Sequence, residues 1–156
     1  TRLTEDLPSN AGIVRIYVAG DFFSRDYMAA WYAVAAAHPR VLFYAYTKSL
    51  SYWLSMRDCT PENMVLTASY GGRDDNLIAE HNLRATKVVF SEAEAAFLGY
   101  EIDHDDSHAA RPSLRNESFA LMLHGTQPKG SDAADALKTL KRDGVQHSYN
   151  RKAVGA

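Results

Sequence analysis

The chain has 156 residues, of which 46% are hydrophobic and 23% are charged, and its formal net charge at pH 7 is −2. These values fit an ordinary globular domain with its own core, and the small negative charge gives no general attraction to nucleic acid or to an anionic membrane, a local basic patch apart. Cys59 is the only cysteine, so a disulfide framework, a cysteine-based zinc site and a cysteine-ligated cluster built from this chain alone are excluded.

No segment has the pattern of a signal peptide, and no apolar stretch is long enough to cross a bilayer. Together with the single cysteine, this favours a cytoplasmic protein with no membrane partner. The chain begins at Thr1 rather than at methionine, and residues 3–10 read like the tail of an earlier element. We therefore expect natural sequence upstream of Thr1.

Five times along the chain a short apolar run ends in polar residues and gives way to a helical pattern. The predicted strands are residues 14–20, 41–46, 64–68, 86–90 and 119–123. The predicted helices run from a cap at Ser24 to a stop at His38-Pro39, and over 49–57, 74–81, 92–98 and 132–140. Residues 100–103 are predicted to form a very short further strand, and residues 104–118 the longest loop.

Strands that alternate with helices predict an α/β fold with a mainly parallel sheet and right-handed crossovers. Five such units are too few for a closed eight-stranded barrel, so we expect an open sheet or part of a TIM-like barrel. We assign residues 1–140 to a single domain and residues 141–156 to a polar tail. Proteins of this class bind ligands at the carboxyl ends of their strands, which is where we expect the site.

Two candidate catalytic residues follow the first two predicted strands. The carboxylate of Asp21 could bind a metal, a ribose hydroxyl or a cationic group, or it could satisfy backbone N–H groups in its turn. Lys48 could hold a phosphate, act as a base or nucleophile if desolvated, or simply be solvated. Tyr44 and Tyr46 lie on the same side of the second strand, and Tyr46 is predicted to frame the pocket.

Two further loops are candidate anion sites. Ser69 and Arg73 flank a Gly-Gly turn whose amides could approach a ligand, although a plain turn explains the same residues. The last predicted strand leads into a helix N-terminus, and we predict ligand contacts there. The predicted contacts are Thr126, Gln127, Gly130 and Ser131. His124, which begins this loop, is a candidate acid–base group or a hydrogen-bonded structural residue.

The densest polar cluster is Asp103-His104-Asp105-Asp106-Ser107-His108. Carboxylates and neutral imidazoles suit zinc, manganese or iron, so a divalent metal bound by His104, Asp105, Asp106 and His108 is one interpretation. The two histidines are four residues apart and would share a face if the segment were helical. The other interpretation is a solvated acidic loop whose aspartates cap local turns.

Five segments taken together, 16–24, 43–50, 66–72, 101–108 and 123–128, resemble the gene product 88 domain family of actinobacterial phages, over roughly residues 13–140. The resemblance implies a phage protein of the infected host cell, without implying an activity. Some members carry an upstream cysteine-rich segment and are similar to radical-SAM-type partial barrels. An iron–sulfur cluster and S-adenosylmethionine are therefore expected here only if cysteines lie upstream of Thr1.

Two functions remain open at this point. The first is an enzyme-like α/β domain that binds a phosphorylated or nucleotide-like ligand at its strand ends, with Asp21, Lys48 and His124 as catalytic groups. The second is a non-catalytic module that binds nucleic acid or a host protein. Its basis is the concentration of basic residues in the last third of the chain: Arg111, Arg115, Lys129, Lys138, Lys141, Arg142, Arg151 and Lys152.

Overall fold

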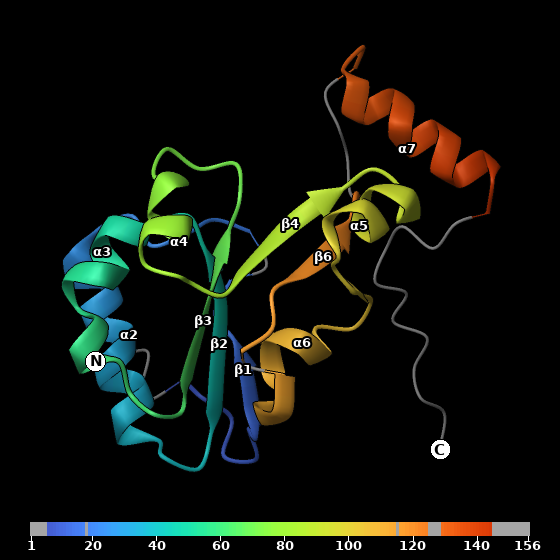
Figure 1. Cartoon of the computed structure of the whole chain (residues 1–156). Helices are drawn as coiled ribbons and strands as arrows, with labels where there is room; N and C mark the ends of the chain where they lie inside the picture. Colours follow the sequence, from blue (N-terminus) through green and yellow to red (C-terminus); the bar gives the residue numbers. More distant parts are fainter. Residues whose placement is uncertain (1–5, 18, 115, 125–128, 145–156) are drawn as a thin grey trace. The chain divides into compact units, whose positions relative to one another are not determined.

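The computed structural model describes residues 6–17, 19–114, 116–124 and 129–144, and in these residues strands and helices alternate (Figure 1). The strands described are β1 (Ile13–Arg15), β2 (Leu42–Thr47), β3 (Met64–Ser69), β4 (Ala85–Val89), β5 (Ile102–Asp103) and β6 (Phe119–Met122). The helices described are α2 (Arg25–Ala37), α3 (Leu50–Ser55), α4 (Asn76–Glu80), α5 (Glu92–Leu98), α6 (Ser107–Ala110) and α7 (Asp132–Arg142), with short 3₁₀ turns η1 (Arg57–Cys59) and η2 (Pro112–Leu114).

The strand pairings β1–β2, β2–β3, β4–β6 and β5–β6 are all parallel. The predicted fold class, an α/β protein with repeated β–α units and a mainly parallel sheet, is confirmed. Two details differ from the sequence prediction. The first strand ends at Arg15 rather than at residue 20, and the predicted loop over residues 104–118 contains α6 and η2.

The chain divides into two compact units, one of Thr1–Ala85 with His108–Glu117 and the other of Thr86–Ser107 with Ser118–Ala156. The first unit contains three parallel strands in the order β1-β2-β3, and the second contains three in the order β4-β6-β5. The single domain over residues 1–140 and the tail over residues 141–156 stay predictions.

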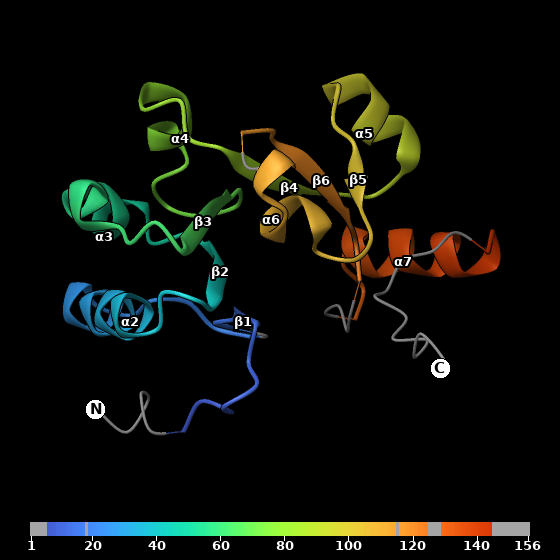
Figure 2. The same ribbon diagram turned by 90° about the horizontal axis from the view of Figure 1, so that it is seen from below.

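The core of the first unit lies between its strands and its helices. Helices α2, α3 and α4 lie on one side of β1, β2 and β3 (Figures 1 and 2). Phe43 of β2 and Met28 of α2 are completely buried in this core. The side-chain amide of Asn63, just before β3, donates to the carbonyl oxygens of Ala35, His38 and Val41 at 2.8–3.0 Å. The polar turn between α2 and β2 is thereby held against the start of β3.

The second unit has a smaller core, to which α5 and α7 contribute together with β4 and β6. Its buried residues are Val89, Ala95, Ala120, Met122, Leu123, Leu137 and Leu140. Gly99 ends α5 in a left-handed conformation, with φ of 70°, which is common for a glycine directly after a helix.

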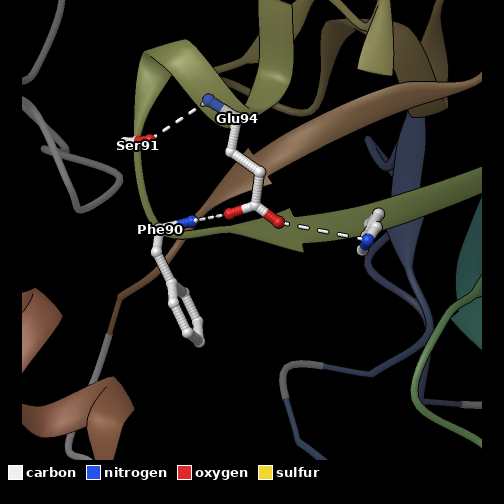
Figure 3. Close-up of polar contacts among 4 residues, drawn as sticks. Phe90, Ser91 and Glu94 are labelled. Atoms are coloured by element: carbon white, nitrogen blue, oxygen red, sulfur yellow. Dashed lines mark hydrogen bonds and ion pairs between the residues drawn. The ribbon is translucent and has the colours of Figure 1, made fainter. Parts of the chain in front are cut away.

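The N-terminus of α5 is held by a reciprocal pair of hydrogen bonds (Figure 3). The hydroxyl oxygen of Ser91 accepts from the backbone N–H of Glu94 at 3.1 Å, and the Glu94 carboxylate accepts from the backbone N–H of Phe90 at 2.8 Å. The Nζ of Lys87 lies 4.0 Å from the other carboxylate oxygen of Glu94. These contacts satisfy two N–H groups near the helix start, as in a capping box.

We expect Ser91→Ala to lower the free energy of unfolding by about 1 kcal/mol, the usual effect of losing an N-cap hydroxyl. Ser51→Ala is the matched control, because Ser51 is an exposed serine within α3. The measurement is urea denaturation followed by circular dichroism. Equal effects of the two substitutions would show that the Ser91 hydroxyl contributes nothing specific.

Candidate functional site

Three polar loops follow the carboxyl ends of β1, β2 and β3 in the first unit. Because these strands are parallel, their carboxyl ends lie along one edge of the sheet. The loops are tied together by a group of residues that we call the strand-end cluster. Its members are Asp21, Thr47, Lys48, Ser49, Gly71, Gly72 and Asp75.

The carboxylate of Asp21 joins the loop after β1 to the end of β2. Its Oδ1 accepts from the backbone N–H of Phe22 at 2.7 Å and from the Thr47 hydroxyl at 2.6 Å. Its Oδ2 accepts from the backbone N–H of Lys48 at 2.6 Å. Two of these donors lie 26 and 27 residues away in sequence. These contacts give Asp21 a positioning role, whereas its catalytic role stays a prediction.

Two hydroxyls complete the connection between the first two loops. The Thr47 side chain is 1% exposed, and its oxygen also accepts from the backbone N–H of Ser49 at 3.0 Å. The Ser49 hydroxyl donates to the carbonyl oxygen of Phe22 at 2.7 Å. The backbone on both sides of Lys48 is thus held against the loop that carries Asp21 and Phe22.

The side chain of Lys48 is exposed, although its backbone is fixed. Its Nζ donates to the carbonyl oxygen of Gly71 at 3.4 Å, a long hydrogen bond, and makes no ion pair with the residues that the structure describes. A Cβ at Gly72 would lie 3.0 Å from the Lys48 Cβ, which shows that the lysine stem runs against the glycine turn. Lys48 therefore presents an exposed positive charge that has no ion-pair partner among the described residues.

The glycine turn after β3 already holds an anion from within the chain. The backbone N–H groups of Gly71 and Gly72 donate to the two carboxylate oxygens of Asp75, each at 2.9 Å. Consecutive amides that converge in this way form a typical anion site. The ligand contacts of Ser69, which is half-buried, and of Arg73, which is exposed, stay predictions.

Aromatic side chains surround the first two strand ends. The Arg15 guanidinium lies 5.2 Å from the ring centroid of Tyr46, so this tyrosine packs against a cation within the protein. The rings of Tyr17 and Phe22 meet edge to face at 5.2 Å. Burial, assisted by Tyr27, raises the pKa of the Tyr17 hydroxyl.

The predicted site residues near α7 belong to the second unit. His124 is exposed just after β6, and Ser131 caps α7 by accepting from the backbone N–H of Ala134 at 3.1 Å. Gly130 has a φ of 82°, which allows the tight turn before this cap. Thr126 and Gln127 lie outside the described residues. The catalytic role of His124 and the ligand contacts of this loop stay predictions.

The predicted metal loop folds as an Asp-capped turn. The Oδ1 of Asp103 accepts from the backbone N–H groups of Asp105 at 3.1 Å and of Ser107 at 3.2 Å. Helix α6 begins only at Ser107, so the condition that His104 and His108 share a helix face is not met. His104 and Asp105 are exposed, whereas His108 is 4% exposed and Asp106 is 9% exposed.

The described residues give no positive support to a metal or to an iron–sulfur cofactor. Among them, no group of three or more His, Cys, Asp and Glu side chains is arranged to hold a metal ion. Cys59 is exposed in η1, and one thiolate does not fit the several that an iron–sulfur cluster requires. Within the same part of the chain, no helix has both the length and the apolar character needed to cross a membrane.

Sequence reasoning missed Thr47, Ser49 and Asp75 as members of the site. Thr47 could have been found from its position, because it is the polar residue that ends an otherwise apolar strand. Asp75 is the N-cap residue of α4, where an aspartate is ordinarily read as a helix cap. Its carboxylate binds the glycine turn instead, which spacing alone does not indicate.

The fold and the strand-end cluster define a protein of parallel β–α units with tied polar loops at the strand ends. The family model described as Gene product 88 matches residues 1–142. The chain belongs to this phage gene product family, which confirms the resemblance inferred from the sequence. No curated protein and no solved structure matches the chain.

Proposed function

We propose that this phage protein binds a phosphorylated or nucleotide-like ligand at the strand-end cluster of its first unit. The observation that carries the proposal is that Lys48 combines a fixed backbone with an exposed ammonium group. Its backbone is fixed by Asp21 and by the neighbouring hydroxyls, and its ammonium is exposed with no ion pair among the described residues. A cation held in place at a strand end is a ready contact for phosphate.

The geometry also defines which groups make the contact. The amides of Gly71 and Gly72 are occupied by Asp75, so the proposed phosphate contact is with Lys48 rather than with the turn. The absence of side chains at these two glycines makes room for the lysine itself, since a Cβ at Gly72 would lie 3.0 Å from the Lys48 Cβ and one at Gly71 would lie 3.2 Å from its Nζ. Asp21 supports the site by positioning the Lys48 backbone and does not itself contact the phosphate.

The test is isothermal titration calorimetry of the purified chain with ribose 5-phosphate and with inorganic phosphate. We expect Lys48→Ala to weaken both by about 10- to 100-fold, because a hydrogen bond to a charged group contributes about 1.5–3 kcal/mol. Lys138→Ala is the matched control, since Lys138 is an exposed lysine that pairs with Asp135 at 2.7 Å. Unchanged binding by Lys48→Ala, or no binding by the wild type, would overturn the proposal.

The alternative function, a non-catalytic module for nucleic acid or a host protein, has weaker support. Two of the basic residues that suggested it are paired on the surface of α7, Lys138 with Asp135 and Arg142 with Asp143. Arg115, Arg151 and Lys152 lie outside the described residues. The ion pairs on α7 do not favour this function over ligand binding at the strand ends.

A further inference from the structure

The loop that carries Asp21 also presents an aromatic ring to solvent. Phe22 and Phe23 are neighbours in sequence but differ sharply, since Phe22 is 1% exposed and Phe23 is 75% exposed. A single exposed phenylalanine is not unusual on a protein surface. Two features set Phe23 apart. Its ring is supported by a second aromatic ring, and its loop is tied to the loop that carries the positive charge of Lys48.

The Phe23 ring is stacked on Tyr27 of α2, with centroids 4.4 Å apart and planes inclined by 22°. Tyr27 in turn lies 6.4 Å from Tyr17, which meets the buried Phe22 edge to face. The surface ring is therefore the outer end of a series of aromatic contacts that reaches the core. Because Tyr27 covers one face of Phe23, the exposure of this ring comes from its opposite face and its edge.

The support of Phe23 is also coupled to Lys48. The carbonyl oxygen of Phe22 accepts from the Ser49 hydroxyl, and Asp21 accepts from the backbone N–H groups of Phe22 and Lys48. Phe23 thus directly follows Phe22, whose carbonyl oxygen is bound by Ser49 in the loop of Lys48. Two loops that are joined to each other thus present a flat apolar face and a cation that makes no ion pair with any residue the structure describes.

We propose that Phe23 is a stacking platform for a nucleobase, so that the ligand of the strand-end cluster is a nucleotide. This inference rests on the proposed function, in which Lys48 holds the phosphate. The π-face of the base stacks on the open face of Phe23, as bases stack on aromatic side chains in single-strand-binding proteins. The nucleotide can be free or can be one residue of a single strand, because both offer a base and a phosphate.

The first test compares adenosine monophosphate with ribose 5-phosphate, which has the sugar and the phosphate without the base. We expect Phe23→Ala to weaken binding of adenosine monophosphate by about 10-fold or more and to leave ribose 5-phosphate unchanged. Phe23→Trp retains a stacking face and should bind adenosine monophosphate at least as well as the wild type. Phe97→Ala, at an exposed phenylalanine of the second unit, is the control and should bind like the wild type.

The outcomes separate this inference from the proposed function. If Phe23→Ala binds adenosine monophosphate normally while Lys48→Ala loses both ligands, the platform is overturned and the phosphate site stands. If the wild type binds neither ligand, both proposals fall. The second test uses a short oligothymidylate in the same titration. Binding tighter than that of thymidine monophosphate, with loss in both Phe23→Ala and Lys48→Ala, supports a single strand as the source. Equal or weaker binding supports the free nucleotide.

Discussion

Asp21→Ala is expected to lower the free energy of unfolding by roughly 2–4 kcal/mol and to weaken phosphate binding in the same protein. The carboxylate accepts three hydrogen bonds that connect the loop after β1 to the end of β2. Each hydrogen bond to a charged group contributes about 1.5–3 kcal/mol, and contributions that share one acceptor are not additive. The substitution also releases the backbone of Lys48, on which the proposed phosphate contact depends.

Two further variants make the interpretation specific. Asp21→Asn keeps the shape of the side chain but replaces one acceptor oxygen with an N–H₂ group, which meets an N–H donor at that position. We expect its loss of stability to be smaller than that of Asp21→Ala and still measurable. Asp58→Ala is the control, because Asp58 is an exposed aspartate of the same unit, and it should change stability by no more than about 0.5 kcal/mol.

The measurement is urea denaturation of all three variants, with phosphate titrations on the folded proteins. A change in Asp21→Ala no larger than that in Asp58→Ala would show that the hydrogen bonds of Asp21 do not stabilise the fold. A loss of stability with unchanged phosphate binding would show that the lysine needs no support from the carboxylate. The second result would leave the structural role of Asp21 intact and would remove its role as a positioning residue.

Local patterns were sufficient to predict most of the secondary structure. Ser24 and Ser91 each cap a helix by accepting a hydrogen bond from the backbone N–H three residues further along the chain. Gly99 adopts the left-handed conformation that ends α5. These features depend on near neighbours, so the sequence displays them directly. The edge at which Asp21 and Lys48 meet was also predictable, since parallel strands that alternate with helices place successive strand ends together.

The partners within the site were not predictable in the same way. Asp21 could have bound a ligand, and only the packed fold brings it to Thr47 and Lys48, 26 and 27 residues along the chain. The spacing of His104 and His108 presupposes a helix that includes both residues. The carboxylate of Asp103 captures the N–H groups that would extend such a helix toward its N-terminus, and α6 begins at Ser107. Local side-chain capping thus competes with helix formation, and residue spacing does not show which prevails.

Phe22→Ala is expected to have the largest effect on stability, a loss of about 3–5 kcal/mol in the free energy of unfolding. The Phe22 ring is 1% exposed and belongs to the core formed by α2, α3 and the first three strands. Its removal leaves a cavity that the surrounding side chains fill only in part. The neighbouring substitution Phe23→Ala removes a ring that is 75% exposed and should cost at most about 1 kcal/mol.

The comparison of these two variants by urea denaturation tests more than the core. If Phe23→Ala is nearly as stable as the wild type, its loss of adenosine monophosphate cannot be attributed to unfolding, and the stacking test becomes decisive. If Phe23→Ala is as destabilised as Phe22→Ala, the outer ring is part of the core and the platform has no basis. Phe22→Leu restores most of the buried volume, and recovery of stability in that variant would confirm that the loss in Phe22→Ala comes from the cavity.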